Sequence, residues 1–225
     1  MGTVSSTHAE TPSGRSLWIE LPDWPGNIAG QHVDVRLTAP DGYQATRSYS
    51  LASSGSAARV QLAVDRLPDG EVSPYLVDDL QPGDMLEVRG PLGGWFVWKE
   101  EQTQPVQLIA GGSGVVPLVA MIRAHAASGS TAPMQLLYSV RTPEDRFFAD
   151  ELSALENVTY AYTRSGPTDA RIGRLTKEHL ASAVLPPGAA VYVCGPTGFV
   201  EAVASWLVEL GHDAASVKTE RFGGA

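Results

Sequence analysis

The feature that most constrains the fold of this 225-residue chain is a change in its pattern of apolar residues near residue 100. Before that point, short alternating stretches are separated by turn signals at residues 41–42 and 68–70. After it, a continuous apolar strand at 106–110 leads into an apolar-rich helix at 115–127, and this alternation then repeats. Short strands divided by turns favour an antiparallel barrel, whereas strands alternating with helices favour a parallel sheet covered on both faces. We therefore expect two domains of different fold class.

The polar stretch at residues 99–105 marks the boundary between the two patterns. We predict an N-terminal tail at 1–15, an antiparallel Greek-key β-barrel at 16–98, a linker at 99–105 and an α/β Rossmann-like parallel-sheet domain at 106–225. The last strand of the barrel is expected at residues 95–98. Within the barrel, Val72, Leu76 and Leu80 are spaced four apart and predict one helical segment.

Charge and cysteine content narrow the classes of function. A formal net charge of −9 disfavours binding to nucleic acid or to an anionic membrane surface. The single cysteine, Cys194, excludes a cluster or metal site built from four thiolates, and we expect no metal site. No apolar run approaches the roughly 18 residues that cross a bilayer, and the first residues lack the apolar core of a signal peptide. We expect a cytoplasmic protein, with a monomer as the default.

Two glycine-containing loops follow predicted parallel strands. The first, GGSGVVP at 111–117, would turn the backbone sharply and present a helix N-terminus to a pyrophosphate. An ordinary strand-to-helix turn explains it equally well, and Pro117 stands where the usual dinucleotide fingerprint has its third glycine. The second loop, CGPTG at 194–198, would meet the first at the carboxyl edge of the sheet. No histidine forms a recognisable pair with Cys194, so a buried small side chain is its simplest interpretation.

In the first half, the segment RSYS at 47–50 lies on a predicted strand. Alternation would place Arg47 and Tyr49 on one face and Ser48 and Ser50 on the other. A cation beside an aromatic ring suits a ligand that has phosphates and a flat ring system. An exposed face of a barrel strand is the alternative.

Five motifs stand in a fixed order along the chain: RSYS, PDGEVSPYL at 68–76, GPLGGWF at 90–96, GGSGVVP and CGPTG. In this order and at this spacing they resemble the ferredoxin–NADP reductase superfamily, from about residue 16 to residue 223. The resemblance implies an FAD-binding barrel followed by an NAD(P)-binding domain. It therefore agrees with the change of pattern near residue 100.

The resemblance also implies roles for residues of the barrel. Arg47 resembles the arginine that binds the flavin pyrophosphate, Tyr49 the tyrosine that lies against the isoalloxazine, and Ser50 the serine near flavin N5. A second phosphate-binding turn is expected at Gly70, Val72 and Ser73.

In the second domain, the resemblance implies sites for the nicotinamide cofactor. The pyrophosphate loop would comprise Gly111, Gly112, Gly114 and Pro117, and the loop that holds the nicotinamide ring would comprise Cys194, Gly195 and Pro196. Glu220 and Phe222 resemble C-terminal residues that approach the flavin, although a frayed tail is the alternative. Ser50, Cys194 and Glu220 are thus the candidate catalytic residues, and Phe222 is expected to cover the flavin until nicotinamide binds.

Arginines at the ends of the second and third strands bear on the choice of cofactor. Arg141 and Arg164 stand where the family contacts the adenosine half, and Arg171 and Arg174 follow in the next loop. Together they favour NADPH over NADH by a small margin. Arginines exposed to solvent are the alternative.

The function implied is electron transfer from NAD(P)H through FAD to a separate protein. The acceptor would be a ferredoxin or flavodoxin, an oxygenase component, or a haem or molybdenum protein, because one cysteine cannot hold a plant-type iron–sulfur cluster. A regulatory or electron-transfer binding module that holds flavin but turns over little NAD(P)H is the alternative. A lipocalin-like carrier would leave the second half of the chain unexplained.

Overall fold

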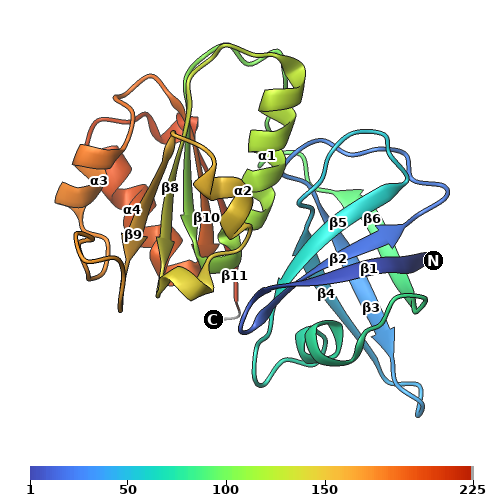
Figure 1. The fold of residues 1–225 in the computed structure, drawn as a ribbon. Helices are drawn as coiled ribbons and strands as arrows, with labels where there is room; N and C mark the ends of the chain where they lie inside the picture. Colours follow the sequence, from blue (N-terminus) through green and yellow to red (C-terminus); the bar gives the residue numbers. More distant parts are fainter. Residues whose placement is uncertain (224–225) are drawn as a thin grey trace.

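A computed structural model describes residues 1–223 as two domains that lie side by side (Figure 1). The strands of the N-terminal domain are β1 (Gly2–Thr11), β2 (Gly14–Glu20), β3 (His32–Thr38), β4 (Gln44–Ser50), β5 (Arg59–Asp65) and β6 (Met85–Leu92). They form one antiparallel sheet in the order β4-β3-β6-β1-β2-β5. The antiparallel domain predicted from the sequence is therefore confirmed.

The two edges of this sheet approach each other and give it the shape of a barrel. Directly after β4, Leu51 forms an antiparallel bridge with Leu62 of β5. The Ala52 N–H donates to the carbonyl of Gln61 at 2.8 Å. Alternate side chains of the strands, such as Val33 and Val35 of β3, are fully buried in the barrel core. The closure removes the exposed edges that an open sheet would present.

Two expectations about the barrel were wrong. Residues 2–11 do not form a tail, because they are strand β1, which pairs with both β2 and β6. The main chain of β1 pairs with β2 across a tight turn, and most of its side chains are polar. Its sequence therefore lacks the apolar alternation that would have predicted a strand. Residues 95–98 are not a strand, since β6 ends at Leu92. Residues 95–98 instead belong to a loop, in which Phe96 and Trp98 are buried. The Trp98 N–H donates to the Ala29 carbonyl at 3.1 Å.

The helical segment expected within the barrel is present as the short π-helix η1 (Tyr75–Asp79). Val72, Leu76 and Leu80 are all fully buried, as their spacing predicted. The Arg15 guanidinium of β2 donates to the carbonyls of Val77 at 3.0 Å and Leu80 at 2.8 Å. These bonds pair carbonyl groups at the end of the segment. The segment therefore closes one end of the barrel.

The C-terminal domain is a parallel sheet with helices on both faces. Its strands are β7 (Val106–Gly111), β8 (Met134–Val140), β9 (Val158–Tyr162), β10 (Ala190–Pro196) and β11 (Val217–Phe222), in the order β11-β10-β7-β8-β9. Its α-helices are α1 (Val115–Ser128), α2 (Ala149–Ser153), α3 (Lys177–Ala183) and α4 (Thr197–Glu209). This architecture confirms the predicted α/β domain. Within residues 1–223, no helix has both the length and the apolar character needed to cross a membrane.

The two faces of the parallel sheet have separate cores. On β7, Leu108 and Ala110 belong to a cluster with α1 and α2, whereas Ile109 belongs to a cluster with α3 and α4. The first cluster also includes barrel-side residues such as Ala52 and Trp98. Figure 1 shows α1 and α2 on the side of the sheet that faces the barrel. This cluster therefore contains residues of both domains, whereas the barrel core and the cluster on the far face of the sheet are separate.

Removal of the fully buried Leu62 side chain should test the closure of the barrel. Leu62→Ala is expected to lower the free energy of unfolding by about 2–5 kcal/mol, because a cavity forms where β5 meets the end of β4. Urea unfolding followed by tryptophan fluorescence measures the change. The control is Met85→Ala in β6, where the side chain is 62% exposed and a change within about 0.5 kcal/mol is expected. Equal effects of the two substitutions would contradict this packing.

Candidate functional site

Two adjoining cavities lie where the barrel meets the carboxyl edge of the parallel sheet. The first has a volume of ≈ 270 Å³, and its lining includes Arg47, Tyr49, Ser50, Gly70, Val72 and Ser73. The second has a volume of ≈ 420 Å³, and its lining includes Gly111, Gly112, Arg141, Thr163 and Pro196. Their linings share Asp65, Leu67, Ser113, Phe222 and Gly223. The two cavities are therefore halves of one cleft, and Phe222 contributes to the wall of each.

Strand β4 supplies the cation and the aromatic ring of the first cavity. Arg47 forms an ion pair with Glu71, and Glu71 also accepts a hydrogen bond from the Tyr43 hydroxyl at 2.7 Å. These contacts hold the guanidinium, which is half exposed, in the lining of the cavity. Burial raises the pKa of Tyr49 to about 12, so this side chain stays neutral and presents its ring. The pair suits an anionic ligand that carries a flat ring.

The turn at residues 67–73 forms the floor beside Arg47. The Gly70 N–H donates to the Leu67 carbonyl, and the Leu67 N–H donates to the Ser73 hydroxyl, both at 3.0 Å. A Cβ atom on Gly70 would lie 2.8 Å from the Ser73 hydroxyl oxygen. A side chain at this position would therefore crowd the turn, which lies beside the cavity.

The loop after β7 approaches the loop after β10 very closely. Gly112 has a φ of 55°, in the left-handed region. A Cβ atom on Gly114 would lie 2.3 Å from the carbonyl oxygen of Cys194. The structure thus brings together the two predicted loops, although Pro117 is buried in the first turn of α1 and lines neither cavity.

Phe199 of α4 is a cleft residue that the sequence did not identify. Its ring covers Gly111 and Gly195, because Cβ atoms at these positions would lie 2.8 Å and 2.9 Å from it. It also lines the second cavity. Its position directly after CGPTG was the only signal that could have indicated this role.

Ser50, Glu220 and Cys194 lie near one another; Ser50 lines the first cavity, whereas Glu220 and Cys194 line neither cavity. The Ser50 hydroxyl donates to Glu220 Oε1 at 3.3 Å, and Glu220 is the register partner of Cys194 across β10 and β11. Burial raises the pKa of Glu220 to about 7, and the hydrogen bond from Ser50 partly opposes this shift. Burial and then the nearby Glu220 charge raise the pKa of Cys194 well above its usual value. Cys194 is thus a neutral thiol, whereas Glu220 can gain or lose a proton near neutral pH.

The arginines expected near the adenosine half are in different places. Arg141 lines the second cavity, where it donates to Asp145 Oδ1 at 2.9 Å. Arg164 and Arg171 are exposed and line neither cavity. The Arg164 N–H donates to the Arg141 carbonyl at 2.9 Å, so its backbone lies close to the rim.

The buried carboxyl of Glu220 should make stability depend on pH. Its pKa of about 7, against an ordinary value of 4.5, means that folded chains keep a proton that unfolded chains lose. Stability is therefore expected to fall as the pH rises from about 4.5 to about 7. Glu220→Gln removes this loss, and the variant should gain up to about 3 kcal/mol relative to wild type across that window.

Urea unfolding of flavin-free protein at pH 5 and pH 8 measures this gain. Glu209→Gln is the control, because Lys177 lowers the pKa of Glu209 and its carboxylate stays charged at both pH values. Its effect should therefore be the same at pH 5 and pH 8. An equal effect of Glu220→Gln at the two pH values would contradict the raised pKa.

Comparisons with known proteins agree with this two-part site. Residues 4–97 match the family model of the oxidoreductase FAD-binding domain, and residues 108–205 match that of the oxidoreductase NAD-binding domain. The toluate 1,2-dioxygenase electron transfer component of Pseudomonas putida is 30% identical over 202 residues, which cover 87% of this chain and 58% of the relative. Flavohemoprotein A of Dictyostelium discoideum is 31% identical over 212 residues, with coverage of 87% and 52%. The chain thus spans little more than half the length of these relatives.

Among solved structures, a similar fold occurs in the flavohem-like FAD/NAD-binding domain of nitric oxide dioxygenase from Vibrio cholerae O1 biovar El Tor. The TM-score is 0.88 at 26% sequence identity, and the match covers 99% of this chain and 98% of that one. The two family models together account for both domains described above. The chain belongs to the ferredoxin–NADP reductase superfamily of FAD- and NAD-binding oxidoreductases.

Proposed function

We propose that this chain takes electrons from NAD(P)H through bound FAD and passes them to a separate redox protein. The observation that carries the proposal is the continuity of the two cavities, which share Ser113 and Phe222, while Ser50 of the first cavity contacts Glu220. A flavin in the first cavity and a nicotinamide in the second would face each other where the cavities adjoin. No general acid of the hydrolase type is needed for such a transfer.

The residues of the first cavity fit a flavin nucleotide. Arg47 offers a charged fork for a phosphate, Tyr49 a neutral ring for stacking, and Ser50 a hydroxyl that contacts Glu220. A Cβ atom would fill the turn at Gly70, where Val72 and Ser73 complete the proposed phosphate site. FAD, when bound, accepts a hydride from the nicotinamide and can release electrons one at a time.

Ser50, Glu220 and the Cys194 loop would position the reactants and hold a proton. Ser50 and Glu220 would place a proton-exchanging pair beside the flavin ring, since Glu220 titrates near neutral pH. The Cys194 loop, with Gly195 and Pro196, would set the position of the nicotinamide through a neutral side chain. For each NAD(P)H oxidised, two electrons reach the acceptor and one proton is released.

For the nicotinamide cofactor, we propose a small preference for NADPH. The cation of Arg141 supports it, since the arginine lines the second cavity and could bind a 2′-phosphate. The carboxylate of Asp145 limits it, because this group already pairs with Arg141 and would repel the phosphate. Arg164 and Arg171 would contribute only if their side chains turned toward the cavity from the exposed rim.

The acceptor is proposed to be a separate protein. Relatives include the electron transfer component of a dioxygenase and a flavohemoprotein, so an oxygenase component or a haem protein is favoured over a ferredoxin, a flavodoxin or a molybdenum protein. A flavin-holding module with little NAD(P)H turnover is the second candidate. A monomer in the cytoplasm remains the default proposal.

Anaerobic stopped-flow mixing of the FAD-loaded protein with NADPH or NADH tests the function. We expect the flavin absorption band to bleach with both nucleotides, and a limiting rate on the order of 1–10³ s⁻¹ would suit an enzyme. The ratio of the two second-order rate constants gives the cofactor preference, and NADPH should lead by less than about tenfold. A protein that binds FAD but is not reduced by either nucleotide would support the binding module. A protein that takes up no FAD would refute both.

Phe222 should compete with the nicotinamide ring for the junction of the cavities. It is 36% exposed and lines both cavities. Phe222→Ala is expected to lower the Kd for NAD(P)+ by about tenfold, because no ring then has to be displaced. Titration of the flavin spectrum with NAD(P)+ measures this constant. Val208→Ala on α4, an exposed apolar position outside the cleft, is the control. Equal affinities in wild type and Phe222→Ala would contradict a covering role.

A further inference from the structure

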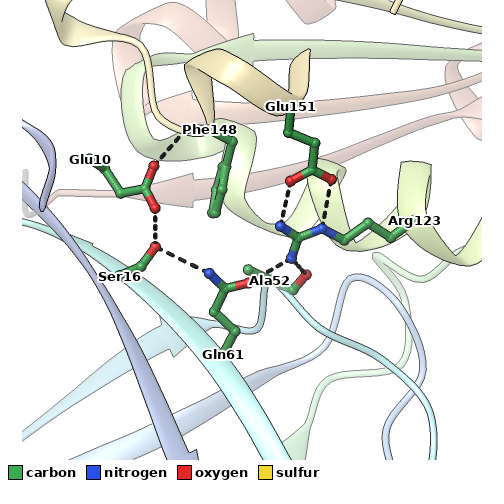
Figure 2. Close-up of polar contacts among 7 residues, drawn as sticks. All are labelled: Glu10, Ser16, Ala52, Gln61, Arg123, Phe148 and Glu151. Atoms are coloured by element: carbon green, nitrogen blue, oxygen red, sulfur yellow. Dashed lines mark hydrogen bonds and ion pairs between the residues drawn. The ribbon is translucent and has the colours of Figure 1, made fainter. Parts of the chain in front are cut away.

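A series of polar contacts joins the two domains beside the cleft. Figure 2 shows its members, which are Glu10, Ser16, Ala52, Gln61, Arg123, Phe148 and Glu151. We call them the interdomain network. None of them lines either of the two cavities. The network therefore has no direct part in the chemistry proposed above.

Arg123 of α1 is the centre of the network. Its Nε and Nη2 atoms donate to the two carboxylate oxygens of Glu151 at 2.8 Å and 2.6 Å. Its Nη1 atom donates to the Ala52 carbonyl at 2.8 Å and to Gln61 Oε1 at 2.6 Å. Glu151 belongs to the C-terminal domain, whereas Ala52 and Gln61 belong to the barrel. One planar guanidinium thus bonds both domains at fixed angles, which a lysine could not reproduce.

The barrel residues that accept hydrogen bonds from Arg123 also close the barrel. The Ala52 N–H donates to the Gln61 carbonyl, while the Ala52 carbonyl and the Gln61 side chain accept from Arg123. Ala52 also lies two residues after Ser50, the proposed flavin N5 partner. The guanidinium therefore fixes the chain just beyond the end of β4.

A second series of hydrogen bonds connects Gln61 with the residue before α2. Gln61 Nε2 donates to the Ser16 hydroxyl at 3.2 Å, and Ser16 donates to Glu10 Oε1 at 2.6 Å. The other oxygen of Glu10 accepts the Phe148 N–H at 2.9 Å. Phe148 precedes α2 with a φ of 55°, and its ring lies 5.1 Å from the Arg123 guanidinium. A barrel carboxylate thus satisfies the backbone of a left-handed residue in the other domain.

The same helix connects Arg123 with the cleft. Val116 lines the first cavity and lies seven residues before Arg123, so both occupy one face of α1. The loop of Gly112–Gly114 leads directly into this helix. A bond that fixes Arg123 to Ala52 therefore also fixes the nicotinamide loop relative to the end of β4.

We propose that Arg123 is a positioning residue that holds the two half-sites at the separation required for hydride transfer. The proposal rests on the function proposed above. Its physical basis is that a small displacement of bound reactants slows transfer far more than it weakens the binding of either one. The interdomain network limits such a displacement from outside the cleft.

Arg123→Gln tests the proposal in the FAD-loaded protein. The limiting rate of flavin reduction should fall by about tenfold or more, while the Kd for NAD(P)H changes by less than about threefold. The visible spectrum of the flavin should not change. Arg123→Lys keeps the charge but loses the fork, so its rate should lie between wild type and Arg123→Gln. Arg36→Gln is the matched control, because Arg36 pairs with Glu87 entirely within the barrel.

Hydrogen exchange measured by mass spectrometry gives a readout that does not depend on turnover. Peptides spanning residues 50–62 and 146–152 should exchange faster in Arg123→Gln and at the wild-type rate in Arg36→Gln. Gln61→Leu removes one barrel acceptor and should reproduce both effects, and it replaces Arg123→Gln if that variant fails to fold.

Faster exchange with an unchanged limiting rate would overturn the positioning role, and unchanged exchange would overturn the coupling itself. A fall in rate that comes wholly from weaker NAD(P)H binding would also overturn the proposal. A wild-type protein that binds FAD but is not reduced would reject the proposed function instead. The exchange data would then decide alone whether Arg123 joins the domains.

Discussion

The packing of the two domains against each other depends on helix α1, which is buried on two sides. Its residues Val115, Val119 and Met121 belong to a core that contains both the parallel sheet and the barrel-side residues Ala52 and Trp98. A helix that is apolar on most of its surface is stable only when neighbours cover that surface. The barrel provides one cover and the sheet the other. The domain interface is therefore as much a folding requirement of α1 as a place for ligands.

In this acidic chain, the positive charges that line the cleft are paired with carboxylates. Two arginines face the cavities, and each is already paired, Arg47 with Glu71 and Arg141 with Asp145. Pairing fixes each cation in place, although an entering phosphate must compete with a carboxylate. The neutral form of Glu220 lessens the repulsion that a further negative charge would cause beside the first cavity. A chain with a net charge of −9 can in this way present sites for anions.

The sequence predicted the parts of the site that lie in short continuous motifs. Arg47, Tyr49 and Ser50 share one strand, and the loops at 111–114 and 194–196 follow strands whose carboxyl ends meet, so local pattern was sufficient. Strand β1 was missed because its pairing uses backbone groups rather than an apolar stripe.

The interdomain network was beyond sequence reasoning for a different reason. Arg123 and Gln61 are 62 residues apart, and no local pattern connects them.

The close contact of Gly114 with the backbone of Cys194 has one more consequence. Cys194 is 1% exposed, and its backbone carbonyl lies where the two glycine loops meet. It is also the only cysteine of the chain. An alkylating reagent therefore has a single thiol target, which it can reach only while local opening of the structure exposes Cys194. The rate of alkylation would therefore report how often this buried part of the parallel sheet opens, without any added label.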